Sequence, residues 1–147
     1  LSRQKVPYIN PKNSKENKCQ KGAYVVNITS HESKVTIVAS GTEVELALKV
    51  QEKLKENNVH SKVVSMPCME IFDKQPEEYR SDIIEYDTLI VTLEAGSIMS
   101  WQKYIKNKGM NIGIDQFGES APYKEVYNHF DLSEEKVTNF IQKKLRE

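Results

Sequence analysis

The sequence has few of the features that mark a disulfide-rich, metal-binding or membrane protein. Its 147 residues include two cysteines, Cys19 and Cys68, which are far apart and unclustered. Such a pair makes no disulfide framework and is typical of a reducing, cytoplasmic setting. The three histidines show no metal-ligand spacing, so we expect no metal site. We also expect no signal peptide or membrane contact, because no apolar run approaches the roughly 18 residues of a membrane span.

The chain also lacks net charge, since 21 Lys and Arg side chains balance 21 Asp and Glu. That balance argues against a nucleic-acid or membrane-surface binder, which would need a cationic surface. The charge is uneven, however, because residues 1–21 carry six cations and one anion, a net charge of +5. With Pro7 and Pro11 and little apolar periodicity, this stretch is interpreted as the end of a preceding domain plus a basic linker. Residues 22–147 are expected to form one domain.

Strands alternate with helices from residue 23 onward. Five short runs rich in β-branched residues predict strands at residues 23–28, 35–39, 61–66, 88–93 and 111–115. Helices are predicted at residues 42–57, 69–73, 76–84, 100–106 and 122–130, with a closing helix after Ser133. This order predicts an α/β fold: an open, mostly parallel sheet of about five strands with helices on both faces.

Two of these helices carry recognisable end signals. Thr42 and Glu45 have capping-box spacing, in which each side chain satisfies a free backbone N–H of the first turn. Ser133 is the predicted N-cap of the closing helix, where Phe140 and Ile141 belong to an apolar stripe.

Ligands of open α/β sheets usually bind beyond the carboxyl ends of the strands. Residues 40–43, 94–97 and 115–120 are expected there. The first segment leads into a helix N-terminus, which suits an anion, but it has one glycine and no following Lys-Ser or Lys-Thr. Glu43 would also repel an anion. A structural turn is therefore preferred, and a small-anion-binding regulatory module stays open as the alternative.

Glu94 is a candidate general base, because burial at the end of a strand can raise the pKa of a carboxylate. No partner acid, base or nucleophile is recognisable near Glu94 or Asp115, so capping or interdomain hydrogen bonds are preferred for both. Trp101 and Tyr104 are interpreted as core or interface anchors. The residues by themselves predict a domain without its own catalytic, cofactor-binding or metal residues.

A series of short motifs resembles the C-terminal domain of the transketolase family. Seven motifs follow the family's order at consistent spacing, and together they cover nearly the whole chain. Gln116 departs from the Arg that many members carry, and residues 5–21 are richer in Lys and Asn than the usual linker. The motifs are residues 35–47, 63–67, 72–75 with Tyr79 and Arg80, 94–96, 101–104, 113–122 and the closing helix.

The resemblance implies a parent transferase that moves a two-carbon ketol unit between sugar phosphates of the pentose phosphate pathway. It implies thiamine diphosphate and a divalent metal, usually Mg²⁺, in a homodimer, with the chemistry carried by the cofactor. This chain would be an inactive structural piece whose partners are the missing N-terminal and middle domains, and we expect no cofactor within it. The equivalent domain of another thiamine enzyme, such as deoxyxylulose-phosphate synthase, stays open.

Residues 1–4 resemble the last strand of the preceding pyrimidine-binding domain of that family. There the Arg of the motif holds the substrate phosphate, so the resemblance assigns substrate binding to Arg3. A planar guanidinium suits this role because it offers paired N–H donors to a phosphate. The start at Leu1 instead of Met also predicts a piece of a longer protein.

Overall fold

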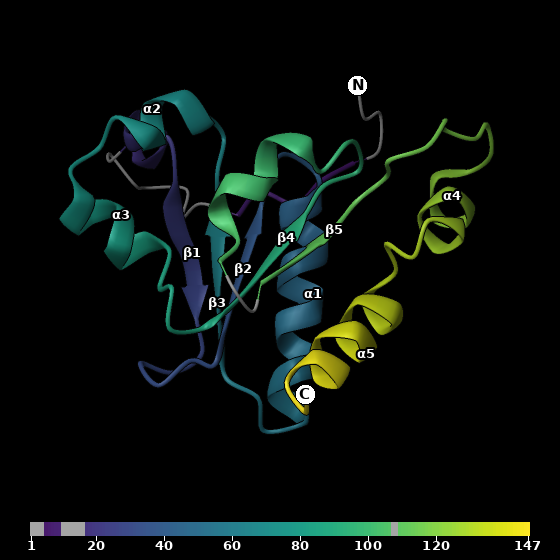
Figure 1. The fold of residues 1–147 in the computed structure, drawn as a ribbon. Helices are drawn as coiled ribbons and strands as arrows, with labels where there is room; N and C mark the ends of the chain where they lie inside the picture. Colours follow the sequence, from purple (N-terminus) through teal and green to yellow (C-terminus); the bar gives the residue numbers. More distant parts are fainter. Residues whose placement is uncertain (1–4, 10–16, 107–108) are drawn as a thin grey trace.

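A five-stranded open sheet lies between two layers of helices in the computed structural model, which describes residues 5–9, 17–106 and 109–147 (Figure 1). The strand order is β1-β3-β2-β4-β5; β1 runs antiparallel to β3 and the other pairs are parallel. The predicted fold class, strand number and largely parallel pairing are therefore confirmed. The strands are β1 (Tyr24–Ile28), β2 (Val35–Ala39), β3 (Ser61–Ser65), β4 (Leu89–Leu93) and β5 (Met110–Ile112).

The three central strands, β2, β3 and β4, are buried along their whole length. Successive side chains of a strand point to opposite faces, so each central strand supplies both cores. Ile37 of β2 packs into one core and its neighbour Val38 into the other. This double burial explains why the central strands are continuous apolar or β-branched runs, except for the polar residues of β3 discussed below.

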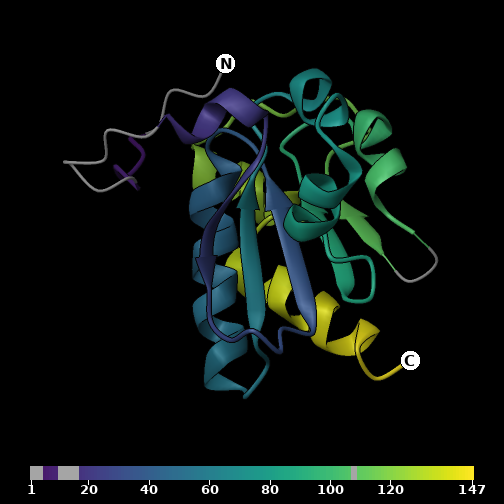
Figure 2. The same ribbon diagram turned by 90° about the vertical axis from the view of Figure 1, so that its left-hand side faces the viewer.

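The helices divide between the two faces of the sheet, as predicted (Figure 2). The helices α1 and α5 pack against each other and over one core, whereas α2, α3 and η2 cover the other core. The first layer consists of α1 (Glu43–Glu56), α4 (Tyr123–His129) and α5 (Glu134–Lys144). The second consists of α2 (Met69–Asp73), α3 (Glu77–Ile83) and the 3₁₀ helices η1 (Lys18–Lys21) and η2 (Met99–Tyr104).

The capping-box prediction at Thr42 is wrong. Thr42 has φ −70° and ψ −24°, which is helical, whereas a capping side chain needs the extended conformation of an N-cap. Its hydroxyl instead donates to Glu43 Oε1 at 2.5 Å. Ser133 does have the extended conformation, but its side chain makes no capping hydrogen bond, and Phe140 keeps 38% of its surface exposed.

Two further elements differ from the predictions. The predicted helix at 100–106 is the 3₁₀ helix η2, and β5 covers Met110–Ile112 instead of residues 111–115. The strand pairing ends at Ile112 opposite Leu93, because β4 itself ends there. Residues 113–115 therefore enter the loop at the carboxyl edge of the sheet.

Gly22 fixes the entry of the chain into the domain. It has φ 81°, its N–H donates to Cys19 O at 3.0 Å, and its carbonyl accepts from Cys68 N at 3.0 Å. A Cβ at this position would lie 2.3 Å from Phe72 N and 2.4 Å from Cys68 O, which are backbone atoms that cannot turn aside. Only glycine fits, and this contact joins η1 to α2.

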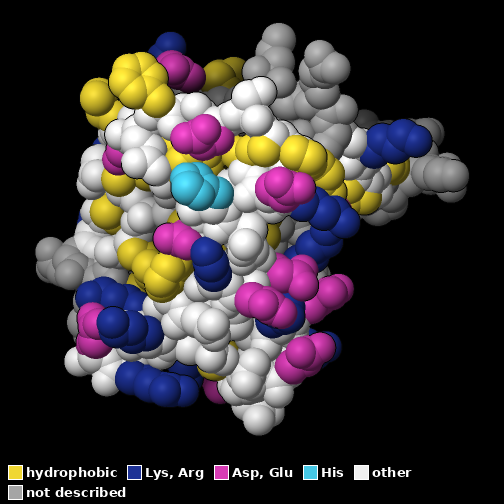
Figure 3. All heavy atoms as spheres, turned by 90° about the vertical axis from the view of Figure 1, so that its right-hand side faces the viewer, with side chains coloured by type: hydrophobic (Ala, Val, Ile, Leu, Met, Phe, Trp, Pro, Cys, Tyr) yellow, Lys and Arg dark blue, Asp and Glu magenta, His cyan; other side chains and the backbone are white. Residues whose placement is uncertain are grey.

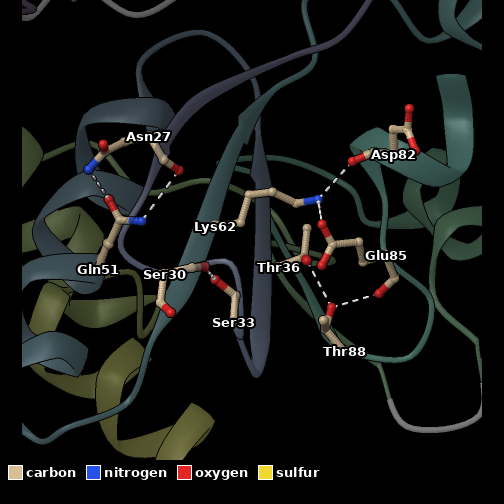
Figure 4. Close-up of polar contacts among 9 residues, drawn as sticks. All are labelled: Asn27, Ser30, Ser33, Thr36, Gln51, Lys62, Asp82, Glu85 and Thr88. Carbon is tan, nitrogen blue, oxygen red and sulfur yellow. Dashed lines mark hydrogen bonds and ion pairs between the residues drawn. The ribbon is translucent and has the colours of Figure 1, made fainter.

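Lys62 is a buried cation on β3 (Figure 4). Its side chain is 2% exposed, and Nζ donates to Glu85 Oε1 at 2.5 Å and to Asp82 O at 2.9 Å. On the opposite face Gln51 of α1 donates to Ser61 O at 2.8 Å and accepts from Asn27 Nδ2 at 2.7 Å. Polar side chains thus link β3 to a helical layer on each side.

We expect Gly22→Ala to lower the free energy of unfolding far more than Gly41→Ala. Both glycines have positive φ, which costs alanine about 1–2 kcal/mol, but the space around Gly41 is open within 4 Å whereas Gly22 has backbone atoms in the way. Urea unfolding followed by circular dichroism gives both values. Equal losses would show that the contact with Phe72 and Cys68 contributes nothing.

The ion pair between Lys62 and Glu85 predicts that substitutions of its two members change the free energy of unfolding by different amounts. Glu85→Ala should destabilise the fold by about 3 kcal/mol, because it leaves a buried ammonium without its counter-charge. Lys62→Met should stay close to the wild type, since an apolar side chain of similar size replaces the cation and Glu85 is 34% exposed to water. Urea unfolding measures both; a Lys62→Met loss as large as that of Glu85→Ala contradicts this reasoning.

Candidate functional site

The three segments predicted to lie at the carboxyl edge of the sheet do meet there. Residues 40–43, 94–97 and 115–120 follow β2, β4 and β5, which are neighbours in the sheet (Figure 1). Ser40 Oγ donates to Glu94 Oε2 at 3.4 Å, and Ser97 Oγ donates to Asp115 Oδ1 at 3.0 Å. Side-chain hydrogen bonds therefore join each segment to the next.

Glu94 holds η2 onto the end of β4. Its Oε2 accepts from the indole Nε1 of Trp101 at 3.1 Å, and Trp101 is only 1% exposed. Burial raises the pKa of Glu94, the nearby charge of Glu43 raises it further, and the hydrogen bonds from Trp101 and Ser40 act in the opposite direction. The carboxylate thus supplies the acceptor for a buried indole of the same domain, whereas a capping or interdomain hydrogen bond was preferred from the sequence.

Glu43 is a second carboxylate at this edge, and it is 5% exposed. Its Oε1 accepts from the hydroxyls of Thr42 at 2.5 Å and Tyr127 at 2.6 Å, so it links the start of α1 to α4. Two carboxylates, Glu43 and Glu94, therefore lie close to the turn at residues 40–43. Their charge disfavours an anion at this helix N-terminus.

Asp115 is exposed and organises the loop after β4. Its Oδ1 accepts from Ser97 Oγ and from the backbone N–H of Ile98 at 3.1 Å. The neighbouring Ile114 N–H donates to Gly96 O at 2.8 Å. Asp115 therefore ties the chain after β5 to the chain after β4 within the same domain.

The aromatic side chains of η2 lie in the core. Trp101 and Tyr104 are 1% and 3% exposed, and Tyr104 packs against Phe72 with its hydroxyl donating to Asp73 Oδ1 at 2.8 Å. Burial opposes ionisation of Asp73, yet the hydrogen bonds from Lys103 and Tyr104 leave its pKa below the usual value. The interpretation of Trp101 and Tyr104 as core anchors is confirmed.

The sequence reasoning missed an open groove of about 900 Å³ between the loops after β4 and β5. Its walls are mainly apolar, and its rim carries Met99 and Phe117, which are 80% and 98% exposed. Hydrophobic side chains gather along the upper part of this face of the molecule (Figure 3). The available signal was Phe117, a large apolar residue in an otherwise polar and glycine-containing loop. The lining residues are 95–99, 102 and 114–118.

No catalytic constellation accompanies this groove among the described residues. Within residues 5–9, 17–106 and 109–147, no three His, Cys, Asp or Glu side chains come together to hold a metal ion. Over the same residues, no helix combines the length and apolarity needed to cross a membrane. Arg3, the substrate-binding residue assigned by resemblance, lies outside the described residues. What the carboxyl edge can do chemically is hold loops together and present apolar side chains.

Comparison with known proteins identifies the family whose members resemble this chain. Residues 22–133 match the family described as "Transketolase-like TK C-terminal domain". The transketolase of Aquifex aeolicus is 36% identical over 146 residues, which are 98% of this chain and 21% of that protein. The chloroplastic transketolase of Solanum tuberosum is 39% identical over 140 residues, which are 93% of this chain and 19% of that protein.

Solved structures agree with these relatives. A crystal structure of a transketolase mutant from Pichia stipitis has a TM-score of 0.87 and 30% identity, and it covers 98% of this chain and 20% of that chain. The transketolase of Campylobacter jejuni has a TM-score of 0.76 and 35% identity, with 84% of this chain and 19% of that chain covered. This chain therefore spans about a fifth of the length of the transketolases that it matches.

The buried position of Glu94 predicts a pH-dependent effect of Glu94→Gln. Because the pKa of Glu94 is raised, its ionised form costs stability at neutral pH, and the cost fades as pH falls to about 4.5, the ordinary value. Gln keeps an acceptor for Trp101 without the charge, so the variant should melt above the wild type at pH 7, and the difference should shrink toward pH 4.5. Calorimetry across this range measures it.

Glu94→Ala is the matched control for the hydrogen bond. It leaves the buried indole N–H without an acceptor and should lower the free energy of unfolding by about 1–3 kcal/mol. A Tm difference between wild type and Glu94→Gln that stays constant with pH would contradict a raised pKa at Glu94.

Proposed function

The chain belongs to the transketolase family, in the C-terminal domain of that family, and we propose that it serves as the structural C-terminal domain of a transketolase. The parent enzyme would transfer a two-carbon ketol unit between sugar phosphates in the pentose phosphate pathway, with thiamine diphosphate and Mg²⁺. The observation that carries the proposal is the family match over residues 22–133, together with transketolase relatives 36–39% identical over nearly the whole chain. The relatives named above are transketolases, which favours this enzyme over deoxyxylulose-phosphate synthase.

The carboxyl edge of the sheet supports a structural role for this domain within the enzyme. Glu43, Glu94 and Asp115 are each engaged in hydrogen bonds that hold loops and helices of this chain. Two adjacent carboxylates do not suit a diphosphate, and the described residues include no acidic cluster for Mg²⁺. The groups that bind the cofactor and metal would therefore belong to the preceding domains, in the four fifths of the relatives that this chain does not span.

Substrate binding is proposed at Arg3. One matched structure is described as a Pichia stipitis transketolase in complex with sedoheptulose 7-phosphate, and another as a complex with xylulose 5-phosphate. By resemblance, Arg3 would hold the phosphate of such a substrate as part of the domain that precedes residue 22. Residues 5–21 would then be the link between that domain and this one.

The compartment and the oligomeric state of the parent enzyme are also proposed from the family resemblance. We propose a cytoplasmic homodimer. Support for a reducing compartment comes from Cys19 and Cys68, which are both free thiols.

The test is Arg3→Ala in the complete transketolase from the same gene. Loss of a charge-assisted hydrogen bond costs about 1.5–3 kcal/mol, so kcat/KM for xylulose 5-phosphate should fall roughly tenfold to a hundredfold. A ketol donor without a phosphate should be used equally well by the variant and the wild type. A coupled assay with ribose 5-phosphate, thiamine diphosphate and Mg²⁺ measures both.

Two controls accompany this assay. Arg3→Lys keeps the charge without the paired donors and should lie between wild type and Arg3→Ala. The 147-residue chain by itself should show no turnover. Turnover by this chain alone would refute its structural role, and an equal loss with both ketol donors would refute phosphate binding by Arg3.

A further inference from the structure

A second cavity, of about 510 Å³, lies where α1, α4 and the start of α5 meet (Figure 1). We call it the helical cavity; its lining comes from within residues 42–49, 123–128 and 132–134. Its volume falls in the range of about 300–1,000 Å³ that is usual for small-molecule sites. Leu46 and Leu132, which are 9% and 1% exposed, give it an apolar surface that is continuous with the core. The structural role proposed for the domain makes no use of this cavity.

Two tyrosines of α4 form an aromatic wall of the helical cavity. The ring centres of Tyr123 and Tyr127 lie 6.1 Å apart with an angle of 84° between the planes, which is an edge-to-face pair. The hydroxyl of Tyr127 donates to Glu43 Oε1 at 2.6 Å and fixes that ring, whereas Tyr123 is 50% exposed. Aromatic rings attract one another in offset and edge-to-face contacts. This wall and the two leucines therefore favour a planar aromatic ligand.

The charges around the helical cavity favour an anionic group on that ligand. Two carboxylates line the cavity, and each is paired with a lysine. Glu45 Oε1 lies 2.7 Å from Lys49 Nζ, and Glu134 Oε1 lies 3.6 Å from Lys53 Nζ. Lys124 lines the cavity too, and it forms no ion pair with any residue that the structure describes. The negative charges are thus neutralised in place, while one ammonium group stays available to a ligand.

Ser133 adds a hydrogen-bond donor to the same cavity. It lines the cavity at the start of α5, and its side chain makes no capping hydrogen bond. The hydroxyl can therefore donate to an anionic oxygen. The cavity thus combines an apolar surface with a small number of polar groups, which is the usual composition of a small-molecule site.

We propose that the helical cavity binds an aromatic carboxylate. The ring lies against Tyr123 and the two leucines, and the carboxylate accepts hydrogen bonds from Lys124 and Ser133. This binding does not depend on the proposed function, because every residue that carries it belongs to helices of this chain or to their ends.

Titration with naphthoate, two fused aromatic rings bearing one carboxylate, tests the proposal. The backbone amide chemical shifts of the isotope-labelled 147-residue chain should change in a saturable way, with a Kd below about 1 mM. The largest changes should fall within residues 42–49, 123–128 and 132–134. Naphthalenemethanol has the same rings without the charge, so it should bind at least fivefold more weakly.

Two variants at exposed positions locate the site. Tyr123→Ala removes the stacking ring, Lys124→Ala removes the cation, and each should raise the Kd for naphthoate at least fivefold. Both side chains are exposed, so both variants should keep the Tm of the wild type. The matched controls are Phe117→Ala, an exposed aromatic residue in the groove after β4 and β5, and Lys74→Ala, an exposed lysine at the end of α2. Both controls should leave the Kd unchanged.

Four results would overturn the proposal. They are the absence of a saturable shift at millimolar naphthoate, shifts centred on residues 95–99 and 114–118, equal binding of naphthoate and naphthalenemethanol, and a Kd that neither Tyr123→Ala nor Lys124→Ala changes. Calorimetry on the complete transketolase from the same gene should give a Kd within threefold of that of the chain. Loss of binding there would show that another domain covers the cavity and would refute a ligand site in the enzyme. Ketol transfer is assayed separately, so failure of the proposed function and failure of this site are distinguishable.

Discussion

Burial of the central strands on both faces is the constraint on which the rest of this structure depends. Every residue of β2, β3 and β4 is buried, so helices must cover the sheet from both sides and the interior has little room for polar groups. Among the polar side chains that do enter, Lys62 donates to the carboxylate of Glu85 and Gln51 donates to the carbonyl of Ser61. The carboxylates of the candidate site, Glu43, Glu94 and Asp115, lie beyond the ends of the strands.

The sequence predicts the parts of the fold that follow from periodicity. Continuous β-branched runs give β2 and β4, and the helical spacing of apolar residues gives α1 and α5, so the fold class and both helical layers are confirmed. The wrong predictions concern local conformation. Thr42 has the right residue type for a cap but helical backbone angles, and β5 stops at Ile112 because its partner strand ends, which only the paired strands reveal.

The candidate site likewise has one part that the sequence predicts and another part that it does not. Strand ends can be placed from sequence, so residues 40–43, 94–97 and 115–120 were expected together, and they are. The bond from Trp101 to Glu94 and the groove beneath Phe117 depend on how loops fold over one another, which no spacing encodes. The ordered motifs supply the family, whereas the geometry shows carboxylates at the carboxyl edge that hold loops and helices of this chain together.

The edges of the sheet have a consequence for how this chain meets other molecules. An open sheet leaves unpaired N–H and C=O groups along its outer strands, which invite strand addition and aggregation. Here one edge is β5, only three residues long, and the other is β1, whose ladder with β3 is interrupted by an irregularity between Val25 and Asn27. Both edges are therefore poor templates for another strand, and the domain can expose an apolar loop surface for association without also offering its backbone to amyloid-like growth.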